Sequence, residues 1–132
     1  MMKKVEVVAA IIKHNDLILC AQRNVSPLKY ISEKFEFPGG KIETGETQIQ
    51  ALKRELKEEL EIEPEIGNLF LTVTHSYPDF ELKMHSYLCI IENKNIILKE
   101  HKSVVWLEKS HLMSLDWAAA DLPIVQKLMN DE

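Results

Sequence analysis

The sequence predicts an α/β protein in which a mixed β-sheet is sandwiched between α-helices (α/β/α). Short β-branched and apolar runs separated by turn residues recur along most of the chain, which is typical of strands. Two other segments, from residue 47 to no later than Pro64 and over residues 119–129, carry apolar residues at steps of three and four, as amphipathic helices do. Many strands with only two helices indicate a sheet covered on both faces.

Length and composition predict a single domain over residues 1–132. A chain of 132 residues and 15.3 kDa is near the commonest domain size, and 45% hydrophobic with 28% charged residues is an ordinary globular composition. No repeat, low-complexity tract or Gly/Ser linker divides the chain. We therefore expect one hydrophobic core and no second catalytic domain.

The charge balance excludes some partners. A net charge of −5 gives no electrostatic reason to bind a nucleic-acid polymer, and a polyanionic small molecule would need a bridging cation. No apolar run approaches the roughly 20 residues of a membrane-spanning helix, and Glu6 interrupts the apolar N-terminal stretch, which lacks a cleavage site. We expect a cytoplasmic protein without membrane contact, in which Cys20 and Cys89 are buried free thiols.

The expected strands are bounded by turn residues. They occupy residues 5–12, 17–23, 35–37, 66–76, 80–91, 95–99 and 103–107. The first two form a hairpin through residues 14–16, residues 28–34 form a loop, and Trp106 anchors the last strand.

The first helix has a recognisable start. Thr47 and Gln50 form a capping-box pattern, so the helix begins near residue 47. A stripe of apolar residues at helical spacing is expected to be buried against the sheet. It consists of Ile49, Leu52, Leu56 and Leu60.

The densest chemical signal is an acidic cluster on this helix. At about 100° per residue, Glu55, Glu58 and Glu59 fall within one sector, so their carboxylates are expected to converge. Like charges at these spacings repel, and a hard cation such as Mg²⁺ suits carboxylate oxygens. On the helix alone, a solvated acidic face paired with neighbouring basic residues would be the simpler explanation.

Together with the preceding loop, the helix resembles the Nudix box, which is a Gly, five residues, a Glu, seven residues and then Arg-Glu-apolar-x-Glu-Glu-x-Gly-apolar. The matching positions are Gly40, Glu46, Arg54, Glu55, Leu56, Glu58, Glu59 and Ile62. Glu61 stands where the family has Gly, at the end of the helix where a left-handed conformation is common. This departure affects the local turn and removes no ligand.

The resemblance implies the Nudix fold and a metal-dependent hydrolase of nucleoside diphosphates linked to another group. The implied ligands of Mg²⁺, or of Mn²⁺, are a carbonyl near Gly40 and the carboxylates of Glu55, Glu58 and Glu59. Without such ions the carboxylates would repel a triphosphate.

Three further roles follow from the resemblance. Arg54 would brace Glu46 or a neighbouring carboxylate, as structural support for the site. Either Glu55 or Glu59 would take a proton from the attacking water, and the sequence does not rank them. Lys41 either reaches a phosphate oxygen or is a solvated loop lysine.

The resemblance to the MutT-like group of this family covers nearly the whole chain. It rests on residues 21–23, residues 36–43, Glu100 and residues 120–123. In that group the loop Glu matching Glu100 is a further metal ligand or base, although a polar loop residue without function is an even alternative. Arg23 would contact the nucleotide, or is an exposed arginine at the end of a strand.

Asp121 is the most informative position for the base. An ionised Asp only accepts hydrogen bonds, which suits the exocyclic amine of cytosine and repels O6 of 8-oxoguanine unless burial keeps the acid protonated. In this group an Asn there binds oxidised guanine, whereas the branch that hydrolyses CTP carries the same Ala-Asp-x-Pro tail. Capping of the second helix is an alternative role, compatible with base binding. Aromatic candidates to stack on the base, or to fill the core, are Phe37, Tyr77, Phe80 and Trp117.

The sequence therefore predicts a Mg²⁺-dependent pyrophosphohydrolase that converts a nucleoside triphosphate and water to a monophosphate and pyrophosphate, acting on CTP, dCTP or modified cytidine triphosphates. The runner-up is an 8-oxo-dGTP diphosphatase that sanitises the nucleotide pool. A Nudix-fold module that binds a nucleotide without cleaving it is a third hypothesis, against which the intact acidic cluster argues. A nucleotide sugar or dinucleoside polyphosphate substrate is a fourth, and the sequence predicts no oligomeric state.

Overall fold

A seven-stranded sheet organises the part of the chain that the computed structural model describes, residues 2–130. Its strands are β1 (Lys3–His14), β2 (Leu17–Gln22), β3 (Phe35–Glu36), β4 (Gly39–Lys41), β5 (Glu65–Ser76), β6 (Phe80–Ile90) and β7 (Ser103–Glu108). Their hydrogen-bonded order is β3-β2-β1-β6-β5, with β4 beside β1 and β7 beside β2. Six of the seven predicted strands are confirmed within one or two residues.

The sheet is mixed, as predicted. β1 and β6 run parallel along their length, whereas the other strand pairs are antiparallel. β1 is central, since Val8 pairs with Gly40 of β4 on one side and with His85 of β6 on the other. The glycine strand β4 therefore lies against the middle of the sheet.

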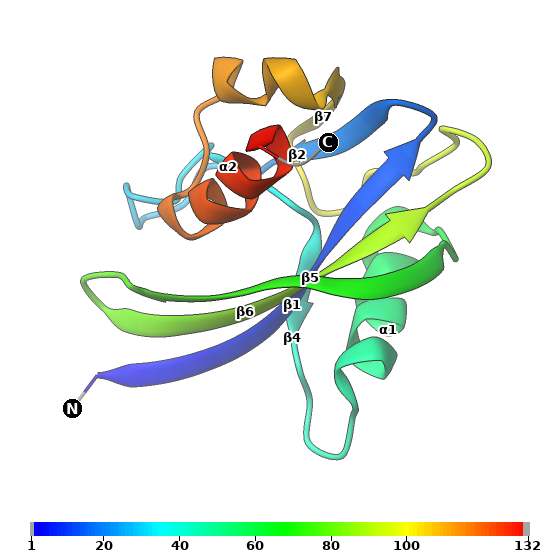
Figure 1. The fold of residues 1–132 in the computed structure, drawn as a ribbon. Helices are drawn as coiled ribbons and strands as arrows, with labels where there is room; N and C mark the ends of the chain where they lie inside the picture. The colour runs from blue at the N-terminus through cyan, green and yellow to red at the C-terminus, as the bar shows by residue number, and fades with distance from the viewer. Residues whose placement is uncertain (1, 131–132) are drawn as a thin grey trace.

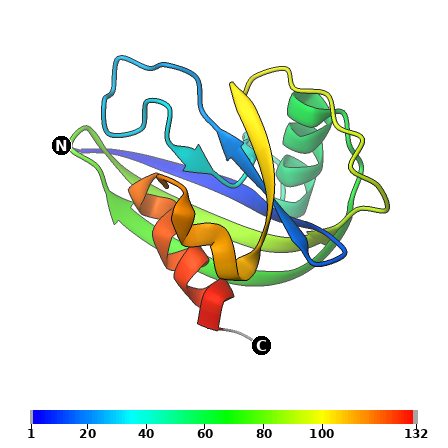
Figure 2. The ribbon, with the colours of Figure 1, turned by 90° about the horizontal axis from the view of Figure 1, so that it is seen from above.

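Helices cover both faces of this sheet (Figure 1 and Figure 2). They are α1 (Gln48–Leu60), the 3₁₀ helices η1 (Lys109–Ser114) and η2 (Ala119–Asp121), and α2 (Leu122–Asn130). Along β1, Ala10 and Ile12 pack with the leucines of α1, whereas Ala9 and Ile11 pack with α2. The α/β/α arrangement is thus confirmed, with a separate apolar cluster on each side of the sheet.

Helix α1 begins as its sequence predicts. The Thr47 side chain accepts from the Gln50 amide, and the Gln50 side chain accepts from the Thr47 amide, which completes the capping box. The three leucines of the predicted stripe are fully buried. Ile49 is 40% exposed, so its predicted burial is wrong, because burial along α1 begins only at Ala51.

The predicted strand over residues 95–99 is absent. This segment instead docks on the end of α1, where the amides of Ile97 and Lys99 donate to the carbonyls of Leu60 and Glu59 at 3.0 and 3.2 Å. Helix C-terminal carbonyls lack partners within the helix, so a loop that supplies amides is stabilised there without a strand partner. The contact fixes the path of the chain toward Glu100.

Smaller features of the fold bear on the other expectations. Cys20 and Cys89 are free and buried, as predicted. Trp106, the expected anchor of the last strand, lies in β7 and packs on the α1 side of the sheet. The second helix begins as a 3₁₀ turn at Ala119 and becomes α-helical at Leu122. Among the described residues, no helix is long and apolar enough to span a membrane.

Candidate active site

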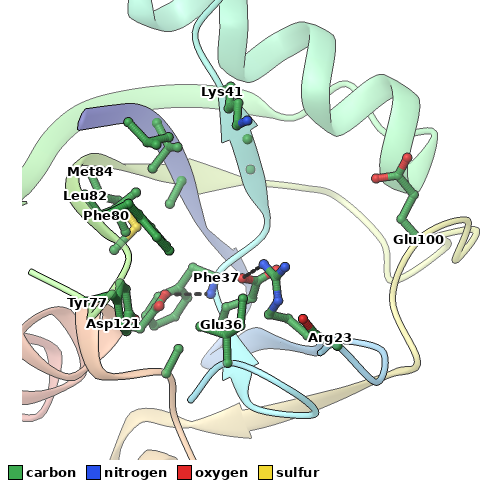
Figure 3. A pocket seen from close by; sticks show the side chains of 18 of the residues that line it. Arg23, Glu36, Phe37, Lys41, Tyr77, Phe80, Leu82, Met84, Glu100 and Asp121 are labelled. Atoms are coloured by element: carbon green, nitrogen blue, oxygen red, sulfur yellow. Dashed lines mark hydrogen bonds and ion pairs between the residues drawn. The ribbon is translucent and has the colours of Figure 1, made fainter. Parts of the chain in front are cut away.

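A cavity of about 780 Å³ lies over β1 and β4. Of the residues predicted for a site, those that line it are Arg23, Phe37, Gly40, Lys41, Glu59, Glu100 and Asp121. Figure 3 shows Glu100 and Asp121 on opposite sides of this space. Four other predicted residues do not line the cavity: Glu46 in the loop before α1, and Arg54, Glu55 and Glu58 on α1.

The Arg54 guanidinium organises the acidic residues behind the cavity. It donates to both oxygens of Glu46 at 2.7 and 3.0 Å, to Glu55 at 2.9 Å and to the Lys41 carbonyl at 3.0 Å. Glu58 and Glu43 are more distant partners, at 3.4 and 3.7 Å. The hydrogen bond from Arg54 lowers the pKa of Glu46. Arg54 therefore braces Glu46 and fixes β4 relative to α1.

The glycines of β4 allow the strand to fit between β1 and α1. A Cβ atom at Gly39 would lie 1.9 Å from the Val8 carbonyl oxygen, and one at Gly40 would lie 2.4 Å from the carboxyl carbon of Glu55. Both distances are far shorter than a van der Waals contact. The Glu55 carboxylate thus lies directly against the Gly40 backbone, which brings a carboxylate and a peptide group together.

Glu59 is a buried carboxyl group on α1, where the other buried residues are one alanine and three leucines. It is 7% exposed, and its Oε2 atom has no hydrogen-bond partner within the described residues. Burial, followed by the charges of Glu55, Glu100 and Glu36, raises its pKa to about 9. The pKa shift and the unpartnered oxygen both indicate that this position lacks a compensating positive charge.

The three glutamates of α1 do not converge into a closed set of ligands, contrary to expectation. The Glu58 side chain is 58% exposed, and Arg54 binds both Glu55 and Glu58. Within residues 2–130, no three His, Cys, Asp or Glu side chains are arranged closely enough to hold a metal ion as they stand. Arg54 is thus the positive charge beside Glu55 and Glu58, whereas Glu59 has no such partner among the described residues.

Three side chains meet between the two ends of the cavity. Glu36 of β3 accepts from Arg23 Nη1 through one oxygen and from His101 Nε2 through the other, each at 3.1 Å. Arg23 is therefore paired and is not simply an exposed strand-end residue. Figure 3 shows Arg23 and Glu36 side by side, near Phe37 and Asp121.

Asp121 is buried in η2 with 4% of its surface exposed. Its Oδ1 accepts from the Phe37 amide at 3.0 Å, and no amide of α2 in the described chain donates to it, so helix capping is not its role here (Figure 3). Burial, followed by the charge of Glu36, raises the pKa of Asp121 well above its ordinary value. Burial thus favours the protonated acid, the alternative that the sequence left open, and a protonated carboxyl can donate as well as accept.

The aromatic candidates serve both the core and the cavity wall. Phe37 and Trp117 are stacked with ring centroids 4.8 Å apart in the core on the α2 side. Tyr77 is buried, and its hydroxyl accepts from the Ala120 amide at 3.0 Å, next to Asp121. Phe37, Tyr77 and Phe80 line the cavity, whereas Trp117 does not.

Comparison with known proteins agrees with this geometry. A family model described as the NUDIX domain matches residues 7–127. The chain belongs to the Nudix family. It is a Nudix hydrolase, an enzyme class that acts on phosphoanhydride bonds.

Individual relatives of this Nudix protein cover nearly its full length. It is 34% identical to a protein named CTP pyrophosphohydrolase from Escherichia coli (strain K12), over 97% of this chain and 93% of that one. It is 32% identical to an 8-oxo-dGTP diphosphatase of the same organism, over 96% and 98% of the two chains. A solution NMR structure of MutT from methicillin-resistant Staphylococcus aureus 252 shares 39% identity with a TM-score of 0.77, over 100% of both chains.

Two features of this Nudix site were not predicted from the sequence as site residues. Glu36 belongs to a segment that resembles the MutT-like group, but the sequence does not single it out. Its position between Phe35 and Phe37 could have done so, because a strand turns Glu36 to the face opposite the two phenylalanines. His101 lies in a polar loop, where nothing local distinguishes it.

At the departure from the Nudix box, Glu61 adopts the left-handed conformation with φ 53° and ends α1 as a Gly would.

Proposed function

We propose that this Nudix hydrolase is a divalent-cation-dependent pyrophosphohydrolase that converts a nucleoside triphosphate and water to a monophosphate and pyrophosphate, with CTP, dCTP or modified cytidine triphosphates as substrates. One observation carries the proposal: Glu59, Glu100 and the buried Asp121 line one cavity, with Glu100 and Asp121 on opposite sides of it (Figure 3). Its volume of about 780 Å³ is in the range of small-molecule sites. The likeness to a protein named CTP pyrophosphohydrolase supports the cytidine substrate.

The residues around Glu59 fit a divalent cation, which Nudix hydrolases generally use. The unpartnered Oε2 of Glu59 and the neighbouring negative charges favour a positive ion at this place. Carboxylate and carbonyl oxygens are preferred ligands of Mg²⁺ and Mn²⁺. The groups that would hold the ion are the Gly40 carbonyl and the carboxylates of Glu55, Glu58, Glu59 and Glu100. When bound, the ion supplies charge neutralisation for the phosphates and acidifies water.

The chain's own residues supply the remaining parts of the site. Glu59 has a free oxygen beside the cavity, whereas Glu55 is engaged by Arg54 at 2.9 Å, so Glu59 is the better placed of the two proton acceptors. Arg54 keeps Glu46, Glu55 and the β4 backbone in place and does not contact the substrate. Lys41 is exposed at the edge of the cavity, where its ammonium group can meet a phosphate oxygen.

Asp121 is the group proposed to recognise the base. A neutral carboxyl presents one donor and one acceptor, which match N3 and the N4 amine on the edge of cytosine. Phe37 and Tyr77 form the adjacent wall of the cavity. This recognition does not require an ionised carboxylate.

A second substrate, 8-oxo-dGTP, is favoured by the same burial of Asp121. The oxidised base presents O6 as an acceptor beside the N7 hydrogen as a donor, and a neutral carboxyl can pair with both. The 32% identity to an 8-oxo-dGTP diphosphatase is consistent with this alternative. The charge of Asp121 therefore does not decide which of the two nucleotides is the substrate, and kinetic measurements must.

The deciding experiment is a substrate panel with Mg²⁺ or Mn²⁺. CTP, dCTP, 5-methyl-dCTP and 8-oxo-dGTP are incubated with the protein, and monophosphate and pyrophosphate are quantified. We expect both products in equal amounts, with the highest kcat/KM for a cytidine nucleotide. No turnover across the panel, with nucleotide bound tightly, would instead support a binding module. Release of orthophosphate alone would contradict the proposed bond cleavage.

Matched variants locate the activity. Glu58→Gln and Glu59→Gln are expected to lower kcat by at least about 100-fold, because each removes a charged ligand of the proposed cation. Glu63→Gln is the control, since the Glu63 side chain is 80% exposed beyond the end of α1 and its ion pair within residues 2–130 is with Lys57. Equal activity of all three variants would place the chemistry elsewhere.

A further inference from the structure

His101 lines the cavity next to Glu100, and its side chain is only 5% exposed. Its Nε2 donates to one oxygen of Glu36 at 3.1 Å, and Arg23 donates to the other oxygen at 3.1 Å. Two donors from different segments of the chain thus hold both oxygens of one carboxylate. Such a carboxylate has little freedom to rotate.

The state of the His101 ring follows from its second nitrogen. Nδ1 is buried and has no hydrogen-bond partner within the described residues. A proton on Nδ1 would be a buried, unsatisfied donor, which is costly, whereas a proton on Nε2 is accepted by Glu36. The neutral ring therefore carries its proton on Nε2 and acts as a donor to Glu36.

The backbone around His101 is anchored independently of Glu36. The Lys102 amide donates to the Gln22 carbonyl at 2.9 Å, and the Asn24 side chain donates to the Glu100 carbonyl at 2.6 Å. An ion pair between Lys102 and Glu33 adds a third tie. Because the segment is fixed on both sides of His101, the imidazole sets the orientation of Glu36 and not the reverse.

Glu36 lies where a change of orientation would matter. It lines the cavity, and Figure 3 shows it between Arg23 and Asp121. Its charge also acts on Asp121, where it opposes ionisation of the proposed base-recognising group. Movement of Glu36 would thus alter the base end of the cavity. The charge of Glu36 also acts on Glu59, but among the described residues its hydrogen bonds are with Arg23 and His101 and not with the carboxylates of α1.

We propose that His101 is a positioning residue for nucleotide binding, which together with Arg23 holds Glu36 in the orientation that receives the base end of the substrate. The inference rests on the proposed function, because the substrate that it helps to bind is the nucleotide. Its own signature is an effect on KM and on base selectivity, with kcat little changed.

The test compares His101→Leu, which removes the donor at similar volume, with His101→Gln, whose amide nitrogen can reach the position of Nε2. His111→Leu is the control, because His111 is exposed on η1 and does not line the cavity. For His101→Leu we expect a KM about 10-fold higher, kcat within threefold, and a changed ratio of kcat/KM between dCTP and 8-oxo-dGTP. His101→Gln should restore KM to within about threefold of wild type.

Three results would overturn the inference. They are an unchanged KM and selectivity in His101→Leu, a His101→Gln variant as impaired as His101→Leu, or effects of His101→Leu and Glu36→Gln that multiply independently in the double variant. If His101→Leu does not fold, the His101→Gln variant and the cycle of His101→Gln with Glu36→Gln decide.

Failure of the proposed function is recognised separately. It would appear as wild-type protein that hydrolyses no nucleotide, whatever the variants do. In that case the affinity for an α,β-methylene analogue of CTP replaces KM, and ¹⁵N spectra of the imidazole give a readout without substrate. We expect the Nε2-protonated tautomer, with a ring signal that shifts in Glu36→Gln. The Nδ1-protonated tautomer, or an unshifted signal, would contradict the role of His101.

Discussion

The Arg54 guanidinium donates to both oxygens of Glu46, at 2.7 and 3.0 Å, across the loop that joins β4 to α1. Glu46 also accepts from the Glu43 amide at 2.9 Å, so its carboxylate closes that loop on itself. The remaining donors of Arg54 reach Glu55 and the Lys41 carbonyl. One planar cation thus sets the distance between the strand that carries Gly40 and the helix that carries the acidic residues.

The first prediction concerns this planar geometry. Arg54→Lys keeps the charge but cannot form the paired hydrogen bonds to Glu46, because an ammonium group lacks the guanidinium fork. We expect kcat/KM to fall about 10- to 100-fold, as is typical when groups that orient metal ligands are lost. Steady-state kinetics on the best nucleotide check this. Lys53→Arg on the exposed side of α1 is the control, and wild-type kcat/KM in Arg54→Lys would refute the bracing role.

The second prediction separates close approach at Gly40 of β4 from backbone strain at Gly45 in the loop that follows. Gly40→Ala would set a Cβ atom 2.4 Å from the Glu55 carboxyl carbon, so the side chain of Glu55 must move and activity should fall by at least about 10-fold. Gly45→Ala meets no atom within 4 Å, but its φ of +88° is unfavourable for Ala. That variant should lose about 1 kcal/mol of unfolding free energy and keep its activity. The reverse pattern in kinetics and urea denaturation would contradict both assignments.

The third prediction concerns the pH dependence of stability without divalent cations. Glu59 has a pKa of about 9 in the folded protein against an ordinary 4.5, so between these values the folded state keeps a proton that the unfolded state has lost. The free energy of unfolding must therefore fall as pH rises through this window. Urea denaturation in EDTA near pH 5, 7 and 8.5 measures the slope.

Glu59→Gln provides the control for that slope, because an amide does not titrate. This variant should be more stable than wild type near pH 8.5 and should show a flatter dependence, while losing activity. Saturating Mg²⁺ should flatten the wild-type curve as well, since a bound cation favours the ionised carboxylate. Parallel slopes in the two proteins would show that Glu59 ionises normally.

Patterns of residues close together in the sequence predicted most helix and strand positions. The capping box at Thr47 fixed the start of α1, and the alternation and turns placed β1, β2, β5, β6 and β7 within one or two residues. The spacing of the Nudix box identified Gly40, Arg54 and the α1 glutamates before their contacts were visible. These features depend on residues close together in the chain, where propensity and periodicity act directly.

The errors came from contacts between distant segments. Residues 95–99 look like a strand, but the carbonyls of Leu60 and Glu59 take their amides. The convergence of the α1 glutamates depends on Arg54, their neighbour on the helix. Glu46 and the Lys41 carbonyl, both outside α1, hold its guanidinium beside Glu55 and Glu58. The pKa of Asp121 is raised by its burial, at a place where it accepts from the amide of Phe37, which is 84 residues away in sequence. Tertiary context decides each of these, and one sequence does not contain it in local form.

The last prediction tests the protonation of Asp121 through substrate selectivity. A neutral carboxyl and an amide offer the same pair of donor and acceptor, so Asp121→Asn should keep the dCTP to 8-oxo-dGTP ratio of kcat/KM within about threefold near pH 6. Asp121→Ala, which offers neither, should lower kcat/KM about 10- to 100-fold. As pH rises, wild type loses its donor whereas Asp121→Asn does not, so the two ratios should diverge. A difference above about 10-fold already near pH 6 would mean that the carboxyl is ionised despite its burial.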